Sequence, residues 1–267
     1  MSFATKITTL CKTIRLVKNW PTVVQRQFLD RSPGLCQIAF RNGLDIAYRP
    51  EKEDWEAVKE VMLDGVYRYT LQYLRAQTEA LPIFDLGANI GLFSLRAAQC
   101  APESAIHAYE PAPRNFELLE TNQKLNSRLA GRVELHREAV GGRTRQAKFY
   151  YEEQATQASK LMHEPDGQGG IWVSVRALAE IVRTIPGECA LMKIDVEGAE
   201  FEIFQDTPSE IWDKIRAISL EIHRDPAGQK QERDLLKQIE SLGFNCTKEF
   251  SGKGSYFFCR DMRKPSG

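Results

Sequence analysis

The feature that most constrains this chain is a repeated pattern, in which a short apolar run ends in or beside a charged side chain and a helical pattern follows. Five such runs are expected to form strands, at residues 81–86, 105–110, 132–137, 190–195 and 217–223. Strands that alternate with helices predict a doubly wound α/β sheet, because parallel neighbours need crossover connections. Residues 244–250 and 255–260 alternate like a closing hairpin, which brings the expected sheet to seven strands and adds an antiparallel one.

The first 80 residues differ from this pattern and are expected to form an N-terminal helical and hairpin cap region, ahead of a main domain over 81–267. A helical pattern covers residues 3–29 and should break or kink at Pro21. Asn42-Gly43 lies between two short apolar runs and predicts a hairpin turn.

The N-terminal helix is basic, since residues 1–50 carry eight Lys or Arg against two Asp, while the whole chain has 36 basic and 36 acidic residues. Three roles are open for it: a cap over the ligand site or a homodimer contact, a docking surface for an anionic acceptor or carrier protein, and a membrane-surface helix. The neutral total charge argues against a protein that grips nucleic acid, which usually presents a broad basic surface.

Composition and spacing exclude several classes. No run approaches the ~18 apolar residues of a spanning helix, and we expect no signal peptide. Six widely spaced cysteines without a CxxC pair predict neither a zinc site nor a disulfide framework, but reduced thiols in a cytoplasmic protein. The polar stretch 152–170 predicts a loop that acts as a lid over a bound substrate.

Ligands of doubly wound sheets bind at the carboxyl ends of the strands, so residues 85–91 (DLGANIG) form the first candidate site. Gly87 permits a tight turn, Asn89 tolerates a left-handed backbone, and Gly91 lets the next helix pack closely. The dinucleotide fingerprint is absent because Asn89 takes the place of its middle glycine. The carboxylate of Asp85 favours a cationic or amine-bearing ligand over a pyrophosphate.

Two further carboxylates end neighbouring strands. Glu110 lies 25 residues after Asp85, where a carboxylate can accept hydrogen bonds from both hydroxyls of a ribose. Asp195 ends the fourth strand, which is expected beside the first. Glu200 is interpreted as an ordinary acid in the first turn of a helix.

Together these elements resemble the FkbM-type family of S-adenosylmethionine-dependent methyltransferases. The resemblance covers about residues 45–250 and is carried by 83–91 (IFDLGANIG), 109–111 (YEP), 193–200 (KIDVEGAE), Asn115, Asn126 and 138–140 (EAV). It implies a class I methyltransferase fold, a Rossmann-like sheet of seven strands whose last strand is reversed. Members of the family typically methylate hydroxyls of natural products or sugars.

The resemblance also implies a cofactor site for S-adenosylmethionine. Asp85 and the glycine turn would lie at its methionine part, Glu110 at the ribose, and Glu138 and Ala139 beside the adenine. The cofactor-binding residues expected on this basis are Asp85, Gly87, Ala88, Asn89, Gly91, Glu110, Pro111, Asn115, Glu138, Ala139 and Asp195.

An alcohol that accepts a methyl group must lose its proton, and His223 at the end of the fifth strand is the best-placed histidine to take it. Glu221 lies two residues earlier and points to the same face, and Asp195 ends the neighbouring strand. These three residues are the expected catalytic group. They could instead hold one divalent cation; we favour a base without metal, and the sequence leaves both open.

The leading hypothesis is therefore an S-adenosylmethionine-dependent O-methyltransferase acting on a small-molecule or glycan hydroxyl. Three alternatives stand beside it: a nicotinamide-dependent oxidoreductase, a non-catalytic protein that binds an adenosyl ligand, and an RNA methyltransferase. The fingerprint argues against the first, the intact carboxylates against the second, and the neutral charge against the third.

Overall fold

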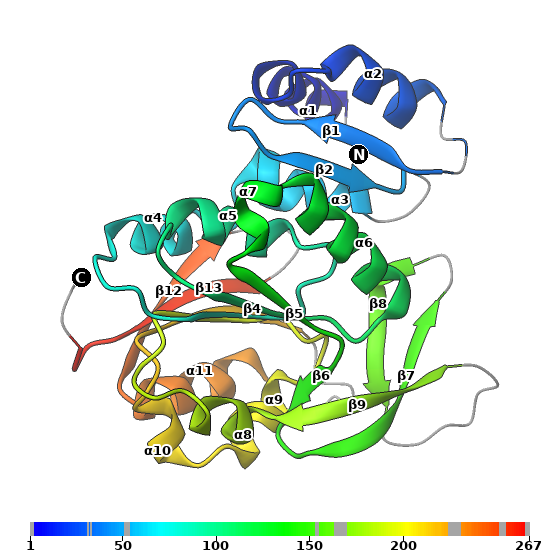
Figure 1. Cartoon of the computed structure of the whole chain (residues 1–267). Helices are drawn as coiled ribbons and strands as arrows, with labels where there is room; N and C mark the ends of the chain where they lie inside the picture. Colours follow the sequence, from blue (N-terminus) through cyan, green and yellow to red (C-terminus); the bar gives the residue numbers. More distant parts are fainter. Residues whose placement is uncertain are drawn as a thin grey trace.

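The computed structural model describes residues 3–30, 32, 34–50, 54–152, 155–162, 170–223, 231–250 and 255–264. Its centre is a seven-stranded sheet (Figure 1) in the order β12 (Phe244–Phe250), β13 (Ser255–Asp261), β11 (Ala217–Ile222), β10 (Leu191–Ile194), β3 (Ile83–Leu86), β4 (Ile106–Tyr109) and β5 (Val133–His136). The five strands from β11 to β5 are parallel, and β13 is antiparallel to both its neighbours. The predicted doubly wound sheet and its reversed last strand are confirmed.

Helices cover both faces of this sheet (Figure 1). One face carries α4 (Arg68–Ala76), α5 (Leu92–Cys100), α6 (Pro113–Leu125) and α7 (Ser127–Ala130), and the other carries α8 (Leu178–Arg183), α9 (Glu200–Asp206), α10 (Ser209–Trp212) and α11 (Glu232–Ser241). Strands β3 and β10 are buried along their whole length, as apolar strands covered on both faces should be. The strand order reverses between them, which places the expected ligand site at their carboxyl ends.

A second sheet of four strands lies beside the edge at β5. Its order is β6 (Ala139–Gly141), β9 (Ile171–Ala177), β7 (Arg145–Glu152) and β8 (Ala155–Met162). The prediction of a loop over 152–170 was wrong for β8, which pairs antiparallel with β7. The sequence ATQASKLM of β8 lacks a run of β-branched or aromatic residues, and its pairing with β7 outweighs that weak local preference. Residues 153–154 and 163–169 lie outside the described part of the chain.

The N-terminal region consists of α1 (Phe3–Leu16), α2 (Trp20–Val24), the π-helical turn η1 (Gln25–Leu29), the hairpin β1 (Cys36–Ala39) and β2 (Asp45–Tyr48), α3 (Asp54–Val58) and the π-helical turn η2 (Lys59–Asp64). The helical pattern is interrupted just before Pro21, which occupies the first turn of α2. The hairpin around Asn42-Gly43 is confirmed. Buried residues of this region, including Val17 and Ile38, belong to the same hydrophobic cluster as Ile83 of the central sheet.

Two asparagines of α6 and its end attach this hairpin to the main sheet. Asn122 accepts a hydrogen bond from the amide of Ala47 at 2.6 Å and donates one to its carbonyl at 3.1 Å. Asn126 does the same for Asp45, at 3.1 and 2.7 Å. The side-chain amides therefore satisfy backbone groups of β2 that a neighbouring strand would otherwise satisfy.

Two observations concern the cysteines and the membrane. Cys246 and Cys259 form a disulfide between directly opposed positions of β12 and β13, so the prediction that all cysteines are reduced was wrong for this pair. The two cysteines lie 13 residues apart in the sequence, and only the register of the hairpin brings them into contact. Among the described helices, none has the length and apolar character needed to cross a bilayer.

Candidate active site

A cavity of about 860 Å³ opens at the carboxyl ends of β3, β10 and β11. A smaller cavity of about 70 Å³ adjoins it on the side of β4 and β6. Both are lined by Gly87, Asn89, Asp195 and Glu197. The site therefore lies where the strand order reverses, as the sheet topology requires.

The turn from β3 into α5 forms the boundary between the two cavities. Gly87 has a φ of 81°, and a Cβ built on it would overlap the carbonyl oxygen of Asp195, so only glycine fits. Asn89 has a φ of 51°, which confirms the expected left-handed backbone. Its side-chain oxygen is buried and has no hydrogen-bond partner among the described residues. An unsatisfied acceptor on the cavity wall is a position where a bound molecule can donate.

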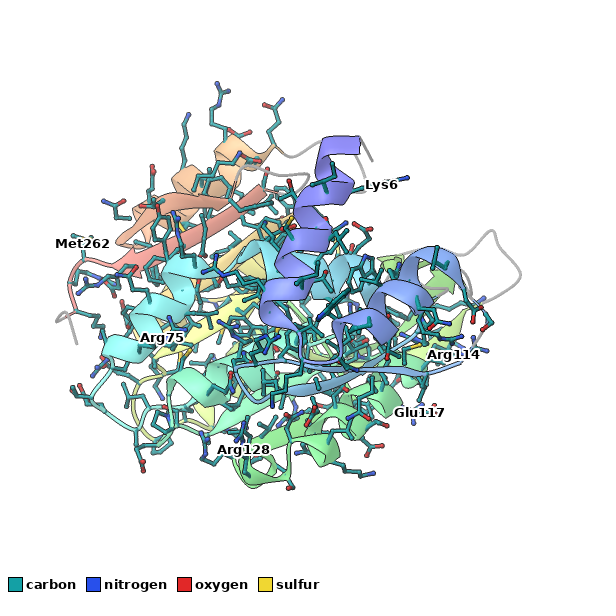
Figure 2. The ribbon with its side chains drawn as sticks, turned by 90° about the horizontal axis from the view of Figure 1, so that it is seen from above. Lys6, Arg75, Arg114, Glu117, Arg128 and Met262 are labelled. Carbon is teal, nitrogen blue, oxygen red and sulfur yellow. A yellow bond between two sulfur atoms is a disulfide. The ribbon has the colours of Figure 1, made fainter. Side chains whose placement is uncertain are left out.

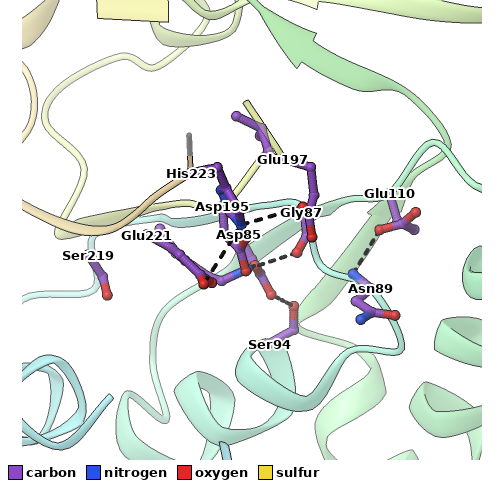
Figure 3. Close-up of polar contacts among 12 residues, drawn as sticks. Asp85, Gly87, Asn89, Ser94, Glu110, Asp195, Glu197, Ser219, Glu221 and His223 are labelled. Carbon is purple, nitrogen blue, oxygen red and sulfur yellow. Dashed lines mark hydrogen bonds and ion pairs between the residues drawn. The ribbon is translucent and has the colours of Figure 1, made fainter. Parts of the chain in front are cut away.

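Glu110 fixes this turn from the neighbouring strand. Its two carboxylate oxygens accept hydrogen bonds from the amides of Asn89 at 2.8 Å and Ala112 at 2.9 Å (Figure 3). The side chain is 6% exposed, and this burial raises the pKa of Glu110 to about 7. Glu110 thus holds the turn from β3 into α5 in place as well as lining the smaller cavity.

A buried lysine beneath the turn was not predicted. Lys193 of β10 forms ion pairs with Asp85 and Asp195, each at 3.1 Å, and donates to the carbonyl of Gly87 at 2.8 Å. Burial opposes its charge, but the two carboxylates raise the pKa of Lys193 above its ordinary value. Asp85 also accepts a hydrogen bond from Ser94 at 2.5 Å and is fully buried, so it lies behind the cavity wall (Figure 3).

His223 is held by the carboxylate of Glu200, so the prediction that Glu200 is an ordinary first-turn acid was wrong. Its Nδ1 lies 2.8 Å from Oε1 of Glu200, which is fully buried at the start of α9; His223 itself directly follows β11 and lies near Asp195 and Glu221 (Figure 3). The same oxygen accepts a hydrogen bond from the amide of Val196 at 3.2 Å. Glu200 is therefore no ordinary first-turn acid; it orients the imidazole.

The other ring nitrogen of His223 faces three carboxylates. Nε2 lies 3.4 Å from Glu197, 3.7 Å from Glu221 and 3.9 Å from Asp195. Burial opposes the positive charge, but the hydrogen bond to Glu200 and the surrounding carboxylates raise the pKa of His223 to about 10. Burial raises the pKa of Glu221 to about 9 and that of Glu197 to about 8. The imidazole and the neighbouring carboxyl groups therefore share protons at neutral pH. Their separations of 3.4, 3.7 and 3.9 Å lie within ion-pair distance.

The structure gathers most of the predicted site residues around the two cavities. The walls include Gly87, Ala88, Asn89, Glu110, Pro111, Asn115, Glu138, Ala139, Asp195, Glu221 and His223. Asp85 and Gly91 line neither cavity and support the turn from behind. Asn115 accepts a hydrogen bond from Arg49 at 2.8 Å, and Arg49 is paired with Asp54, so this residue also joins the site to the hairpin.

Tyr67, Tyr256 and Glu60 also line the larger cavity and were not among the predicted site residues. Tyr67 is buried at the start of α4 and Tyr256 lies opposite Glu221 in the register of β13. Burial raises the pKa of all three side chains, that of Glu60 to about 7. The reversal of β13 beside β11 was the available signal for Tyr256, since it brings that strand's start to the carboxyl end of β11.

The family model for the methyltransferase FkbM domain matches residues 85–246. Methyltransferase sdnD of Sordaria araneosa is 29% identical over 196 residues, which cover 62% of this chain and 74% of that protein. The 31-O-demethyl-FK506 methyltransferase FkbM of Streptomyces tacrolimicus is 28% identical over 214 residues, which cover 68% of this chain and 79% of that protein.

Among solved structures, methyltransferase FkbM from Methylobacillus flagellatus aligns with a TM-score of 0.48 and 13% identity, over 80% of this chain and 62% of that one. The segment matched by the family spans most of the chain and includes the turn, Glu110, Asp195, Glu200 and His223. A nicotinamide-dependent oxidoreductase finds no support here. This chain belongs to the FkbM family of methyltransferases, which are enzymes with a general requirement for S-adenosylmethionine.

Proposed function

We propose that this protein is an S-adenosylmethionine-dependent O-methyltransferase that acts on a hydroxyl of a natural product, sugar or other small molecule. The observation that carries the proposal is the contact between Glu200 and His223 at 2.8 Å. It holds Nδ1 and leaves Nε2 as the atom that can take the proton of an acceptor hydroxyl.

The residues of the two cavities fit the cofactor. When bound, S-adenosylmethionine supplies an electrophilic methyl group on a positively charged sulfur. Asp195 favours a cation in the larger cavity, and so do the carboxyl groups of Glu197 and Glu221, because a bound positive charge lowers their raised pKa values and helps them to ionise. The free side-chain oxygen of Asn89 and the carboxylate of Glu110 would accept hydrogen bonds, and Glu138 and Ala139 line the smaller cavity.

His223 would act as the general base. Its Nε2 would accept the proton of the acceptor hydroxyl, which would make that oxygen nucleophilic toward the methyl group that S-adenosylmethionine would supply. Because the pKa of His223 is raised to about 10, most of the imidazole carries a proton at pH 7. Activity should therefore keep rising above pH 8, beyond the window of an ordinary histidine. Bound positive charge lowers this pKa, which increases the neutral fraction.

The lining of the cavity supports a further proposal, on the chemical class of the acceptor. Among the described residues that line it, the positively charged ones are Lys193 and His223, and both are already paired with carboxylates. A phosphate or carboxylate group would meet mainly carboxyl groups, whose ionisation its negative charge would oppose. A neutral polyol fits better, which agrees with the hydroxyl named in the 31-O-demethyl-FK506 methyltransferase. We accordingly propose no nucleic-acid acceptor.

For the basic N-terminal helix we propose the role of a cap. Lys12 of α1 pairs with Asp64 at the end of η2 at 2.6 Å, and η2 supplies Glu60 and Val61 to the cavity wall. Lys6 lies on the exposed side of α1 (Figure 2), which leaves homodimer or membrane-surface contacts as roles for that side.

The proposal is tested by incubating the protein with S-adenosylmethionine carrying a ¹³C-methyl group and with pools of polyols, sugars and natural products. NMR of the product identifies the methylated atom. A methyl ether is expected, and His223→Ala should lower kcat by ~10²–10⁴ with the cofactor dissociation constant nearly unchanged. Label on nitrogen would replace the assignment by an N-methyltransferase, for which the acidic wall also provides a site. Cofactor binding without transfer to any pool would favour the non-catalytic alternative.

A further inference from the structure

A second cluster of ionisable side chains lies on the edge strand β5 and its neighbour β4, apart from the active-site carboxylates. His107 of β4 is directly opposite Glu134 of β5, and Tyr109 is opposite His136. Residues two apart on a strand share a face, and partners in a parallel ladder do as well. The register therefore places both histidines and Glu134 on one face of the sheet.

The three side chains converge. Nδ1 of His107 lies 3.4 Å from Nε2 of His136 and 3.3 Å from Oε2 of Glu134. All three atoms lie within 4.8 Å of one another. Ligand bonds of about 2.0–2.1 Å at tetrahedral angles place neighbouring donor atoms ~3.3 Å apart, so the separations of 3.4 and 3.3 Å already match a zinc site. One divalent cation can bind all three of these atoms at once.

Both rings are fixed by packing. Phe84 stacks on His107 with ring centroids 4.8 Å apart and an interplanar angle of 15°. Tyr109 stacks on His136 at 4.3 Å and 12°. Glu134 has a side-chain exposure of 62%, which gives an ion access from solvent. Donor atoms on neighbouring strands with locked rings are the arrangement that metal sites require.

We propose that His107, Glu134 and His136 bind one zinc-type divalent ion, with water completing its coordination. Two imidazoles and one carboxylate suit Zn²⁺, while Mg²⁺ and Ca²⁺ prefer oxygen ligands alone. The ion would join β4 to β5. It would also lie next to the smaller cavity, because the carbonyl of His136 accepts a hydrogen bond from the amide of Glu110 at 3.0 Å. This site is independent of the proposed transfer reaction.

The test is calorimetric titration of the purified protein with ZnCl₂, supported by the thermal midpoint with and without zinc. We expect one equivalent to bind and the midpoint to rise. His107→Gln or His136→Gln should weaken binding about 100-fold or more, and the exposed Glu134→Gln at least tenfold without disturbing the core. Glu197→Gln is the matched control, because the donor atoms of Asp195, Glu197 and His223 also lie within 4.8 Å of one another.

Cobalt separates this site from the free thiols at Cys11, Cys36, Cys100 and Cys189. The Co²⁺ protein should show d–d bands without a sulfur charge-transfer band, and His136→Gln should remove those bands. The proposal is overturned if the wild type binds no zinc at a zinc concentration of 100 µM, which is on the order of the dissociation constants of weak surface sites. It is equally overturned if both histidine variants bind normally, if Glu197→Gln abolishes binding, or if the cobalt spectrum shows thiolate ligation.

Discussion

Glu200 and His223 come from different elements, α9 and the end of β11, and meet at 2.8 Å between Oε1 and Nδ1. The carboxylate is fully buried, and its negative charge is matched on this side by the imidazole and by the amide of Val196. The last acid of KIDVEGAE is thus tied to the candidate base. The relationship connects the motif that carries the family resemblance to the residue expected to move the proton.

Replacing this carboxylate should change the base directly. Glu200→Gln keeps the side-chain shape but removes the negative charge, so the pKa of His223 should fall from about 10 by about one unit or more. NMR titration of the imidazole measures the shift, and the rise of activity with pH should move down with it. Glu202→Gln, on the same helix and paired instead with Arg145, is the control and should leave the His223 titration unchanged.

The same cluster sets the pH dependence of stability. His223 has a pKa raised from 6.5 to about 10, so its stabilising contribution is full below pH 6.5 and is lost as the pH rises through 10. Glu221 and Glu197 retain protons in the folded state that the unfolded chain gives up, so their raised pKa values act in the same direction. The free energy of unfolding in urea should fall between about pH 6.5 and pH 9.

The control for this effect is Glu221→Gln, which removes one titrating group and should flatten the slope. The groups facing His223 are Glu200, Glu197, Glu221 and Asp195, and each contributes to its charge. A stability that rises over this pH range in the wild type would contradict the proton sharing described above.

The sheet could be predicted from the alternation of apolar runs and helical patterns. The expected strand order then placed Asp85, Glu110, Asp195 and His223 at the carboxyl ends of the strands. The sequence did not predict Lys193 or Glu200, since local pattern cannot show that a charged side chain is buried against charges from another strand. The disulfide between Cys246 and Cys259 likewise depends on hairpin register. Strand β8 depends on pairing with β7 rather than on its own composition.

Lys193 should be required for stability. Lys193→Met removes the cation between Asp85 and Asp195 and leaves a fully buried carboxylate without its partner. The expected loss is about 3–5 kcal/mol of unfolding free energy, measured by urea unfolding. Adding Asp85→Asn should recover part of it. Lys12→Met, which breaks a surface pair with Asp64, is the control and should cost about 1 kcal/mol or less.

Glu110 should affect both cofactor affinity and the turn. Glu110→Gln has one acceptor oxygen for the two amides of Asn89 and Ala112, so one hydrogen bond is lost together with the negative charge. Calorimetry should show at least tenfold weaker binding of S-adenosylmethionine, and stability should drop by about 1–3 kcal/mol. Glu117→Gln on the exposed side of α6 should change neither quantity (Figure 2). An unchanged dissociation constant would remove Glu110 from the site.

Gly87 cannot be replaced for two reasons, its positive φ and the close approach of Asp195. Comparison with Gly187 and Gly65 distinguishes the two effects. Gly187 has no neighbour within 4 Å of a built Cβ and no positive φ, so Gly187→Ala should be nearly neutral. Gly65 has a φ of 71° but open space, so Gly65→Ala should cost only the backbone term of about 1–2 kcal/mol.

Gly87 combines a φ of 81° with a Cβ that would overlap the backbone carbonyl of Asp195. Backbone cannot rotate away as a flexible side chain can, so the turn must move apart from β10 and strain the contact between Lys193 and the carbonyl of Gly87. Gly87→Ala should therefore lose clearly more unfolding free energy than Gly65→Ala, and it should also weaken cofactor binding by more than tenfold. If Gly87→Ala and Gly65→Ala lost the same unfolding free energy, the turn would be able to move away from β10 without cost. That outcome would contradict the prediction.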